Sequence, residues 1–442
     1  MKNLFKTKSK LLLLGLIIIF SNGLKAQNQR VLTLDEAVKL GIEHSNQLKI
    51  DSLNLEISSS KLKQGKNNNL PQVTDNANYT RISDNITPFT VAFPTGNVVL
   101  NPQILNQSYN SLQAKQLIWA GGKLKKANKI LALDKKAIDF DIQKNTSDVS
   151  YDITNLYYNL FAVNQSKKIV EANIDLLKSQ KTDADNLVKQ GILLENEVLK
   201  IDLAITNLES NLSDLKNTQS LLKNNMAILT GLDANTVVEI PEVLPKSDLK
   251  IQTLAQAQEE ALKNRAELKS ISVRQEQATI GSKIAKSNYL PTLSAIASLN
   301  YDQPNQRVFP NQDNLTPTGY VGVNLNWNLT DLFTNTNKVK ESKFQIAKVN
   351  SIQNQVKEGI QIEVNADYNN YLLAKQKIEI ATKAIEQATE NFRVEQNKFQ
   401  ANNITATDYL NANTLLVQAK INLTTAISNS ELAYKKLQKS IN

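Results

Sequence analysis

The chain of 442 residues contains no cysteine, one histidine (His44) and two tryptophans. Without cysteine, disulfides cannot stabilise the fold. Cysteine and histidine are the usual protein ligands of zinc, and histidine is the usual base in a nucleophile triad. The carboxylates are spread among lysines in helix-like segments, as on a solvated surface. We therefore expect no enzyme, metal site or cofactor, and catalytic turnover by the purified protein would overturn this exclusion.

Proline is scarce and clustered. All ten prolines lie in the windows Pro71–Pro102, Pro241–Pro245 and Pro291–Pro317. Proline breaks the interior of a helix, so the long stretches between the windows are free to be helical. Two windows open alike, Lys66–Pro71 with Asn-Leu-Pro and Lys286–Pro291 with Tyr-Leu-Pro. This similarity predicts two tandem repeats.

Long apolar runs are also rare, and the clearest one is near the N-terminus. Several lysines precede the apolar segment Leu11–Phe20, and Ala26 supplies a small residue at the expected cleavage point. An uncleaved membrane anchor is the alternative, but the run is shorter than the roughly 20 residues that span a bilayer. We therefore expect residues 1–26 to be a signal peptide of an exported protein.

The positive charge does not indicate nucleic-acid binding. Five lysines and no acidic residue lie in the first 26 residues, so the expected mature chain loses five of the positive charges behind the formal net charge of +9. The remaining basic residues are scattered rather than gathered in one stripe. No nucleic-acid partner is expected.

Two very long helical segments dominate the sequence. Residues 123–190 contain no glycine or proline, and a helix of this length would reach roughly 100 Å at about 1.5 Å per residue. Apolar residues at helical spacing predict packing against partner helices, as in a coiled coil. Breaks at Gly191 and Asn402, residue types that tolerate left-handed backbone, predict helical hairpins. An ordinary dimeric coiled coil is the alternative.

Four segments have the two-residue alternation of strands. The clearest runs from Val321 to Leu329, with apolar residues on one face and glycine or asparagine on the other. Such strands of about ten residues are typical of a transmembrane barrel with a watery lumen, whereas a soluble sheet with one covered face is the alternative. Four strands cannot close in lipid, so we expect several chains to contribute strands. Six aromatic residues are candidates for the membrane interface: Tyr79, Tyr109, Trp119, Tyr301, Tyr320 and Trp327.

The expected class is mainly α with β: a helical coiled-coil tunnel joined to a β-barrel with four strands per chain. The first repeat is expected over 27–240, a linker over 241–250 and the second repeat over 251–442. Expected elements of the first repeat are an opening helix, strands at about 71–83 and 107–119, a long helix at 121–190 and a return helix at 195–230. Those of the second are an opening helix, strands at about 291–301 and 319–329, a long helix at 335–401 and a return helix at 405–440.

With this order of elements, the chain resembles the TolC family of outer-membrane efflux proteins over roughly Gln27–Asn442. Similar helix entries begin at Leu32 and Thr253, two Leu-Pro pairs precede strands, and Trp119-Ala-Gly-Gly stands at a strand-to-helix junction. The resemblance implies a homotrimer in the outer membrane with its helices in the periplasm. It also implies an inner-membrane transporter and a periplasmic adaptor as partners, which send small molecules or polypeptides through the duct.

The resemblance also assigns roles near the helix tips. Asp408 and Asn411 take the positions of a pore constriction, where family members carry two acidic residues, so one carboxylate per subunit remains. Ile404 replaces a basic residue that holds the closed state in some relatives, and an ionic latch to Glu197 is not expected. Candidate adaptor-docking residues are Gly191, Ile192, Asn402, Asn403, Leu199 and Leu410.

The sequence leaves the cargo and the transporter class open. A soluble exported protein, either a helical coiled-coil scaffold or a pore-forming protein, is the competing interpretation. The alternating strands distinguish the two, because a pure scaffold has no use for them.

Overall fold

A computed structural model describes residues 29–85, 87–233, 236–243 and 252–442. The expected signal peptide and most of the expected linker lie outside these residues. The described residues form two compact units, each built from both halves of the sequence. We call the first, within 1–50, 142–266 and 357–442, the helical unit. The second, within 51–141 and 267–356, is the sheet unit.

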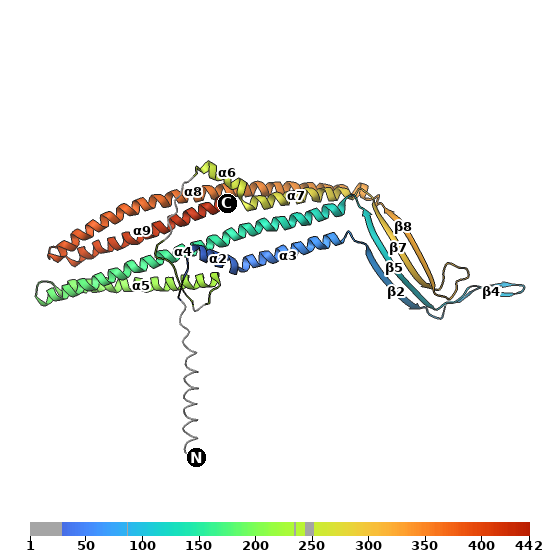
Figure 1. Ribbon diagram of the computed structural model, residues 1–442, viewed down its shortest axis with the longest axis horizontal. Helices are drawn as coiled ribbons and strands as arrows, with labels where there is room; N and C mark the ends of the chain where they lie inside the picture. Colours follow the sequence, from blue (N-terminus) through green and yellow to red (C-terminus); the bar gives the residue numbers. More distant parts are fainter. Residues whose placement is uncertain (1–28, 86, 234–235, 244–251) are drawn as a thin grey trace, which may run out of the picture. The chain divides into compact units, whose positions relative to one another are not determined.

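Two helical hairpins form most of the helical unit (Figure 1). Helix α4 (Lys123–Lys189) is followed by α5 (Glu195–Thr230), and α8 (Asp331–Gln400) is followed by α9 (Ala406–Ile441). Helix α8 begins four residues before the expected start at 335. Both α4 and α8 contribute residues to both units.

One hydrophobic core joins the two hairpins. It contains residues of all four helices, among them Leu177 of α4, Ile201 of α5, Phe399 of α8 and Tyr409 of α9. The rings of Phe399 and Tyr409 stack with 4.9 Å between their centroids. Because Tyr409 is fully buried, this core fixes α9 against α8 near the tip of their hairpin.

Short elements from the start of each repeat complete the helical unit. Helices α2 (Leu34–His44) and α6 (Leu254–Asn264) begin after Thr33 and Thr253, whose hydroxyls accept hydrogen bonds from backbone amides. These are the two similar helix entries noted in the sequence near Leu32 and Thr253. Two strands that were not predicted, β1 (Gln29–Val31) and β6 (Val237–Glu239), pair in parallel beside α2 and α5.

Each opening helix is interrupted where the sequence indicated a single helix. Ser45 separates α2 from α3 (Asn46–Asn67), and Arg265 separates α6 from α7 (Ala266–Ser287). Both breaks lack proline and glycine. Most of α3 and α7 belongs to the sheet unit.

A four-stranded antiparallel sheet lies in the sheet unit, with strand order β2-β5-β7-β8 (Figure 1). The strands are β2 (Gln72–Arg81), β5 (Asn106–Trp119), β7 (Thr292–Gln303) and β8 (Thr316–Asn326). The central pair, β5 and β7, joins the two repeats. An additional hairpin of β3 (Phe89–Phe93) and β4 (Gly96–Asn101), absent from our prediction, lies between β2 and β5 in the sequence.

Candidate functional site

The sheet has its apolar face outward. On β8, Val321 is 87% exposed and Val323 is 73% exposed. On the opposite face of β7, Ser294 and Ser298 are buried. This is the reverse of a soluble sheet, which covers its apolar face and leaves its polar face in water.

The strand register extends the apolar face across all four strands. Val73 pairs with Ala114, Ala114 with Ala297, and Ala297 with Val321, so these side chains share one face. Asp75 of edge strand β2 is an acidic exception on the same face, opposite Leu112. The face is therefore apolar on β7 and β8, whereas β5 adds Asn110 and Gln116 to it and β2 is mixed.

Aromatic residues lie near both ends of this face. A bulge after Leu117 places Trp119 opposite Leu293, and Tyr301 lies farther along β7 on the same face. The separation from Leu293 to Tyr301 is about 27 Å at roughly 3.4 Å per residue. Exposed Tyr79 lies on the same face of β2, near the Tyr301 end.

The register removes two residues from the expected interface set. Tyr109 pairs with Asp302 and Asn78, and Tyr320 pairs with Ser298, so both tyrosines belong to the polar face. The Tyr109 hydroxyl donates to Gln107 Oε1 at 3.0 Å. Neither tyrosine therefore lies on the apolar face, although both were candidates for the membrane interface.

Trp327 also lies outside the strand in which it was expected. Strand β8 ends at Asn326, and the Trp327 indole Nε1 donates to the Tyr289 carbonyl at 3.1 Å. The ring remains about half exposed. Trp327 therefore lies at the junction between the sheet and its helices.

Both edges of the sheet are open. Strands β2 and β8 each have one neighbour in the part of the chain that the structure describes. An unpaired edge presents backbone N–H and C=O groups that can bond another chain. The sheet is thus incomplete on both sides.

The hairpin tips of the helical unit share one backbone design. Gly191 and Asn402 have φ angles of 73° and 57°, in the left-handed region. At the first tip, the Gly191 and Ile192 amides donate to Val188 and Leu187 carbonyls. Equivalent bonds from Asn402 and Asn403 close the second tip, so both α4 and α8 end in a Schellman-type motif.

Exposed apolar side chains gather at the first tip. Ile192, Leu194, Leu199 and Leu203 each have more than half of their surface exposed. At the second tip Asn402 and Asn403 are exposed, whereas Leu410 is half-buried. The predicted docking residues are therefore not equivalent in the two hairpins.

The two tips are joined by a carboxylate. Glu197 Oε2, in the first turn of α5, accepts a hydrogen bond from the Ala406 amide of α9 at 2.7 Å. Glu197 Oε1 lies 2.8 Å from Lys200 Nζ. The Lys200 ammonium and the Ala406 amide hold the pKa of the Glu197 carboxyl below its ordinary value despite partial burial. Ile404, at the expected latch position, packs against the hydrophobic core.

The predicted constriction residues lie one turn apart near the start of α9. Asp408 and Asn411 are both exposed. Asp408 also belongs to the helix cap, because Thr405 Oγ1 donates to Asp408 Oδ2 at 2.8 Å and accepts from the Asp408 amide. The cap fixes the position of this carboxylate on the surface.

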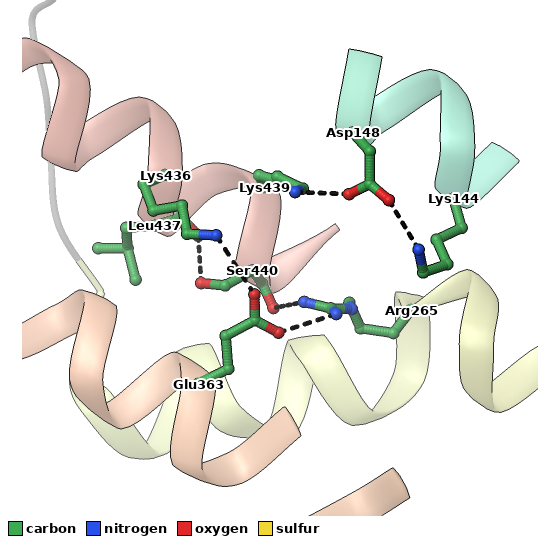
Figure 2. Close-up of polar contacts among 8 residues, drawn as sticks. All are labelled: Lys144, Asp148, Arg265, Glu363, Lys436, Leu437, Lys439 and Ser440. Atoms are coloured by element: carbon green, nitrogen blue, oxygen red, sulfur yellow. Dashed lines mark hydrogen bonds and ion pairs between the residues drawn. The ribbon is translucent and has the colours of Figure 1, made fainter. Parts of the chain in front are cut away.

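A network of charged residues surrounds the C-terminal turn of α9 (Figure 2). Asp148 of α4 bonds both Lys144 and Lys439. Arg265, at the break between α6 and α7, donates to Glu363 of α8 and to the Ser440 carbonyl. Burial raises the pKa of Asp148, but the two lysines outweigh it and hold that pKa below its ordinary value. These contacts fix the end of α9 to three other segments of the helical unit.

Two kinds of feature are absent from the described residues. No cluster of acidic, histidine or cysteine side chains there has the grouping that a metal ion requires. No described helix is both long and apolar enough to cross a membrane.

The architecture is that of outer-membrane channels of known structure. CusC superposes with a TM-score of 0.78 at 10% identity, with 92% of each chain covered. VceC from Vibrio cholerae gives 0.77 at 16% identity and covers 92% of this chain and 95% of its own. CmeC, an outer-membrane channel from Campylobacter jejuni, gives 0.73 at 14% identity, covering 95% of this chain and 90% of its own.

The sequence itself also matches a family. Residues 257–442 fit the model of the outer membrane efflux protein family. No curated protein matches the chain. The resemblance inferred from the sequence is therefore confirmed in the fold of the chain and in the sequence pattern of its second half.

Proposed function

We propose that the chain is one subunit of an outer-membrane exit duct in a tripartite export system. The observation that supports this most strongly is the reversed sheet, with Val321 and Val323 exposed and Ser294 and Ser298 covered. Lipid is the medium in which such a face is favourable. The matched family and the fold point to the same function.

We further propose that three copies complete the barrel. Membrane barrels begin at about eight strands, because an open edge leaves backbone groups unpaired in lipid. Two copies of a four-stranded sheet would reach that lower limit, whereas three give twelve strands and leave more room for a lumen. In this assembly β2 of one copy pairs with β8 of the next.

The aromatic residues on the apolar face suit the two membrane interfaces. The span of about 27 Å between the Trp119 and Tyr301 ends is close to the roughly 25 Å height of the apolar band in such barrels. Trp119 and Trp327 would lie at the helix-proximal interface and Tyr79 and Tyr301 at the outer one. Asp75 lies four residues from Tyr79 on β2, about 14 Å at roughly 3.4 Å per residue, so this carboxylate would lie within the band.

The helical hairpins would extend into the periplasm, with the pore narrowest around Asp408 and Asn411. Three Asp408 carboxylates favour cations, and the neutral Asn411 limits that preference. Drugs, metals, metabolites and polypeptides all remain candidate cargo, supplied by an inner-membrane transporter.

The apolar first tip is the better candidate for docking the periplasmic adaptor. Leu199 and Leu203 lie one turn apart on the exposed side of α5, beside Ile192 and Leu194. In adaptor-dependent export, Leu199→Lys should abolish both transport and co-purification of an adaptor, while the purified channel keeps its conductance. Unchanged export would contradict docking at this surface.

The function can be tested in planar lipid bilayers. Detergent-extracted protein should produce discrete conductance steps. Because the native chain has no cysteine, Asn76→Cys on β2 combined with single cysteines along β8 should give covalent trimers after oxidation. A cysteine pair in α8 at solvent-exposed positions is the control. Recovery of the protein from the soluble periplasm, as monomers without conductance, would support the competing scaffold interpretation.

A further inference from the structure

A cavity of about 320 Å³ opens between α8 and α9 in the helical unit. Tyr151 of α4 also lines it. The apolar part of its lining consists of Leu373, Ala374, Ala426, Leu432 and Ala433. The polar part consists of Tyr151, Asp367, Asn370, Lys377, Asn429 and Lys436.

Asp367 is the unusual member of this lining. Only 7% of the residue is exposed, and its Oδ2 atom is buried without a hydrogen-bond partner among the described residues. Burial raises the pKa of this carboxyl, and the neighbouring Glu363 adds to the effect, while Lys436, Ser440 and Lys439 oppose it. A buried acceptor without a donor is unfavourable, so this oxygen is a ready site for an N–H group.

The cations near Asp367 are already engaged (Figure 2). Lys436 lies 3.6 Å from Glu363, and Lys439 bonds Asp148. Both ammonium groups also lie over the Tyr151 ring, at 5.0 and 5.2 Å from its centroid. Their positions are thus fixed by other partners, and neither one bonds Asp367 Oδ2.

The far end of the cavity has the opposite charge. Lys377 lies about 15 Å from Asp367 along α8, at about 1.5 Å per residue. Lys377 is exposed. A ligand with a positive charge at the Asp367 end therefore meets an apolar wall along its length and a like charge at its other end.

We propose that this cavity binds an amphipathic monoamine, whose ammonium donates to Asp367 Oδ2 and whose apolar body lies against Ala374, Leu432 and Ala433. Lys377 disfavours a second ammonium at the opposite end. The inference does not rest on the proposed duct, because it uses contacts within one chain alone.

Titration calorimetry of the full chain in detergent, at pH 7, tests the proposal with n-hexylamine. The matched probes are n-hexanol, which lacks the charge, and 1,6-diaminohexane, which adds a second one. Since a hydrogen bond to a charged group is a strong one, we expect hexanol and the diamine to bind about tenfold more weakly. Asp367→Asn should weaken hexylamine binding by about the same factor.

A matched control comes from the same helix. Glu386 is an exposed carboxylate of α8 outside the cavity, and Glu386→Gln should bind hexylamine like the native chain. Asp367→Asn removes a buried charge and keeps the shape, so it should fold; its melting curve checks this. If Asp367→Asn does not fold, the variant Ala433→Phe is used instead. Its larger side chain fills the cavity and should abolish hexylamine binding.

Three results would overturn the proposal. They are equal hexylamine affinity in the native chain and Asp367→Asn, equal affinity for hexanol and hexylamine, and no binding at all. The last result would mean that the cavity does not accept an alkylammonium ion. The proposed duct is tested separately by bilayer conductance, which does not depend on amine binding to this cavity.

Discussion

Glu197 is the residue through which the start of α5 holds the start of α9. The first amides of a helix have no partner within the helix, and this carboxylate supplies one for Ala406. Because the Glu197 side chain is only 13% exposed, solvent competes poorly for the bond. The two hairpins are therefore linked at their tips by polar contact as well as by the hydrophobic core.

Replacing this carboxylate should loosen the second tip. Glu197→Ala is expected to reduce the free energy of unfolding by about 1 kcal/mol, the usual cost of losing a helix cap. Amide hydrogen exchange at Ala406 should become faster. Glu195→Ala, an exposed acidic residue in the same turn, is the control. Unchanged protection of the Ala406 amide would show that the core alone positions α9.

Among the strands and helices, β8 offers the clearest test of whether lipid covers the apolar face of the sheet. Val321→Arg would place a charge in the middle of the apolar face, and Asn324→Arg would place the same charge on the polar face. In a lipid bilayer we expect a cost of about 2–4 kcal/mol for the first and little for the second. Guanidinium unfolding of vesicle-inserted protein measures both. Equal stabilities would mean that lipid does not cover this face.

The strands differ in how well the sequence predicted them. Alternation from Val321 to Leu329 predicted β8, but the strand ends at Asn326. Asn328 Oδ1 accepts a hydrogen bond from the Thr330 amide in the turn that leads into α8. The β3–β4 hairpin has alternating Phe89, Val91 and Phe93. The sequence did not predict this hairpin, because Pro88, Pro94 and Pro102 flank its strands and proline is typical of turns.

Other features had no local signal. Strands β1 and β6 are too short to show a period, and the breaks at Ser45 and Arg265 lack proline and glycine. The face of Tyr109 was identified from strand pairing, whereas Tyr320 could have been placed from the sequence, because it precedes Val321 and so shares a face with Gly322 and Asn324. The Glu197 contact depends on the packing of the two repeats. The helix tips, by contrast, were predicted because left-handed backbone selects glycine and asparagine.

At the scale of the whole molecule, charge at the pore should depend on one residue per subunit. In the proposed trimer, Asp408→Asn should bring the ratio of cation to anion permeability close to one. Asn411→Asp should raise it above the native value, since each subunit then carries two carboxylates. Reversal potentials in a potassium chloride gradient measure the ratio. If Asp408→Asn kept the native ratio of cation to anion permeability, the residues that select for cations would lie elsewhere in the pore.

The bond between Glu197 and Ala406 also makes the two halves of the chain unequal. In the second half, the residue that corresponds to Glu197 is Asp408. The Asp408 carboxylate accepts a hydrogen bond from the Thr405 hydroxyl in its own helix cap, whereas Glu197 accepts one from the other hairpin. The first half therefore supplies the accepting carboxylate, and the second half supplies the donating amide. A protein with two copies of the second half would lack the Glu197 carboxylate and could not form this bond, so the second half cannot replace the first.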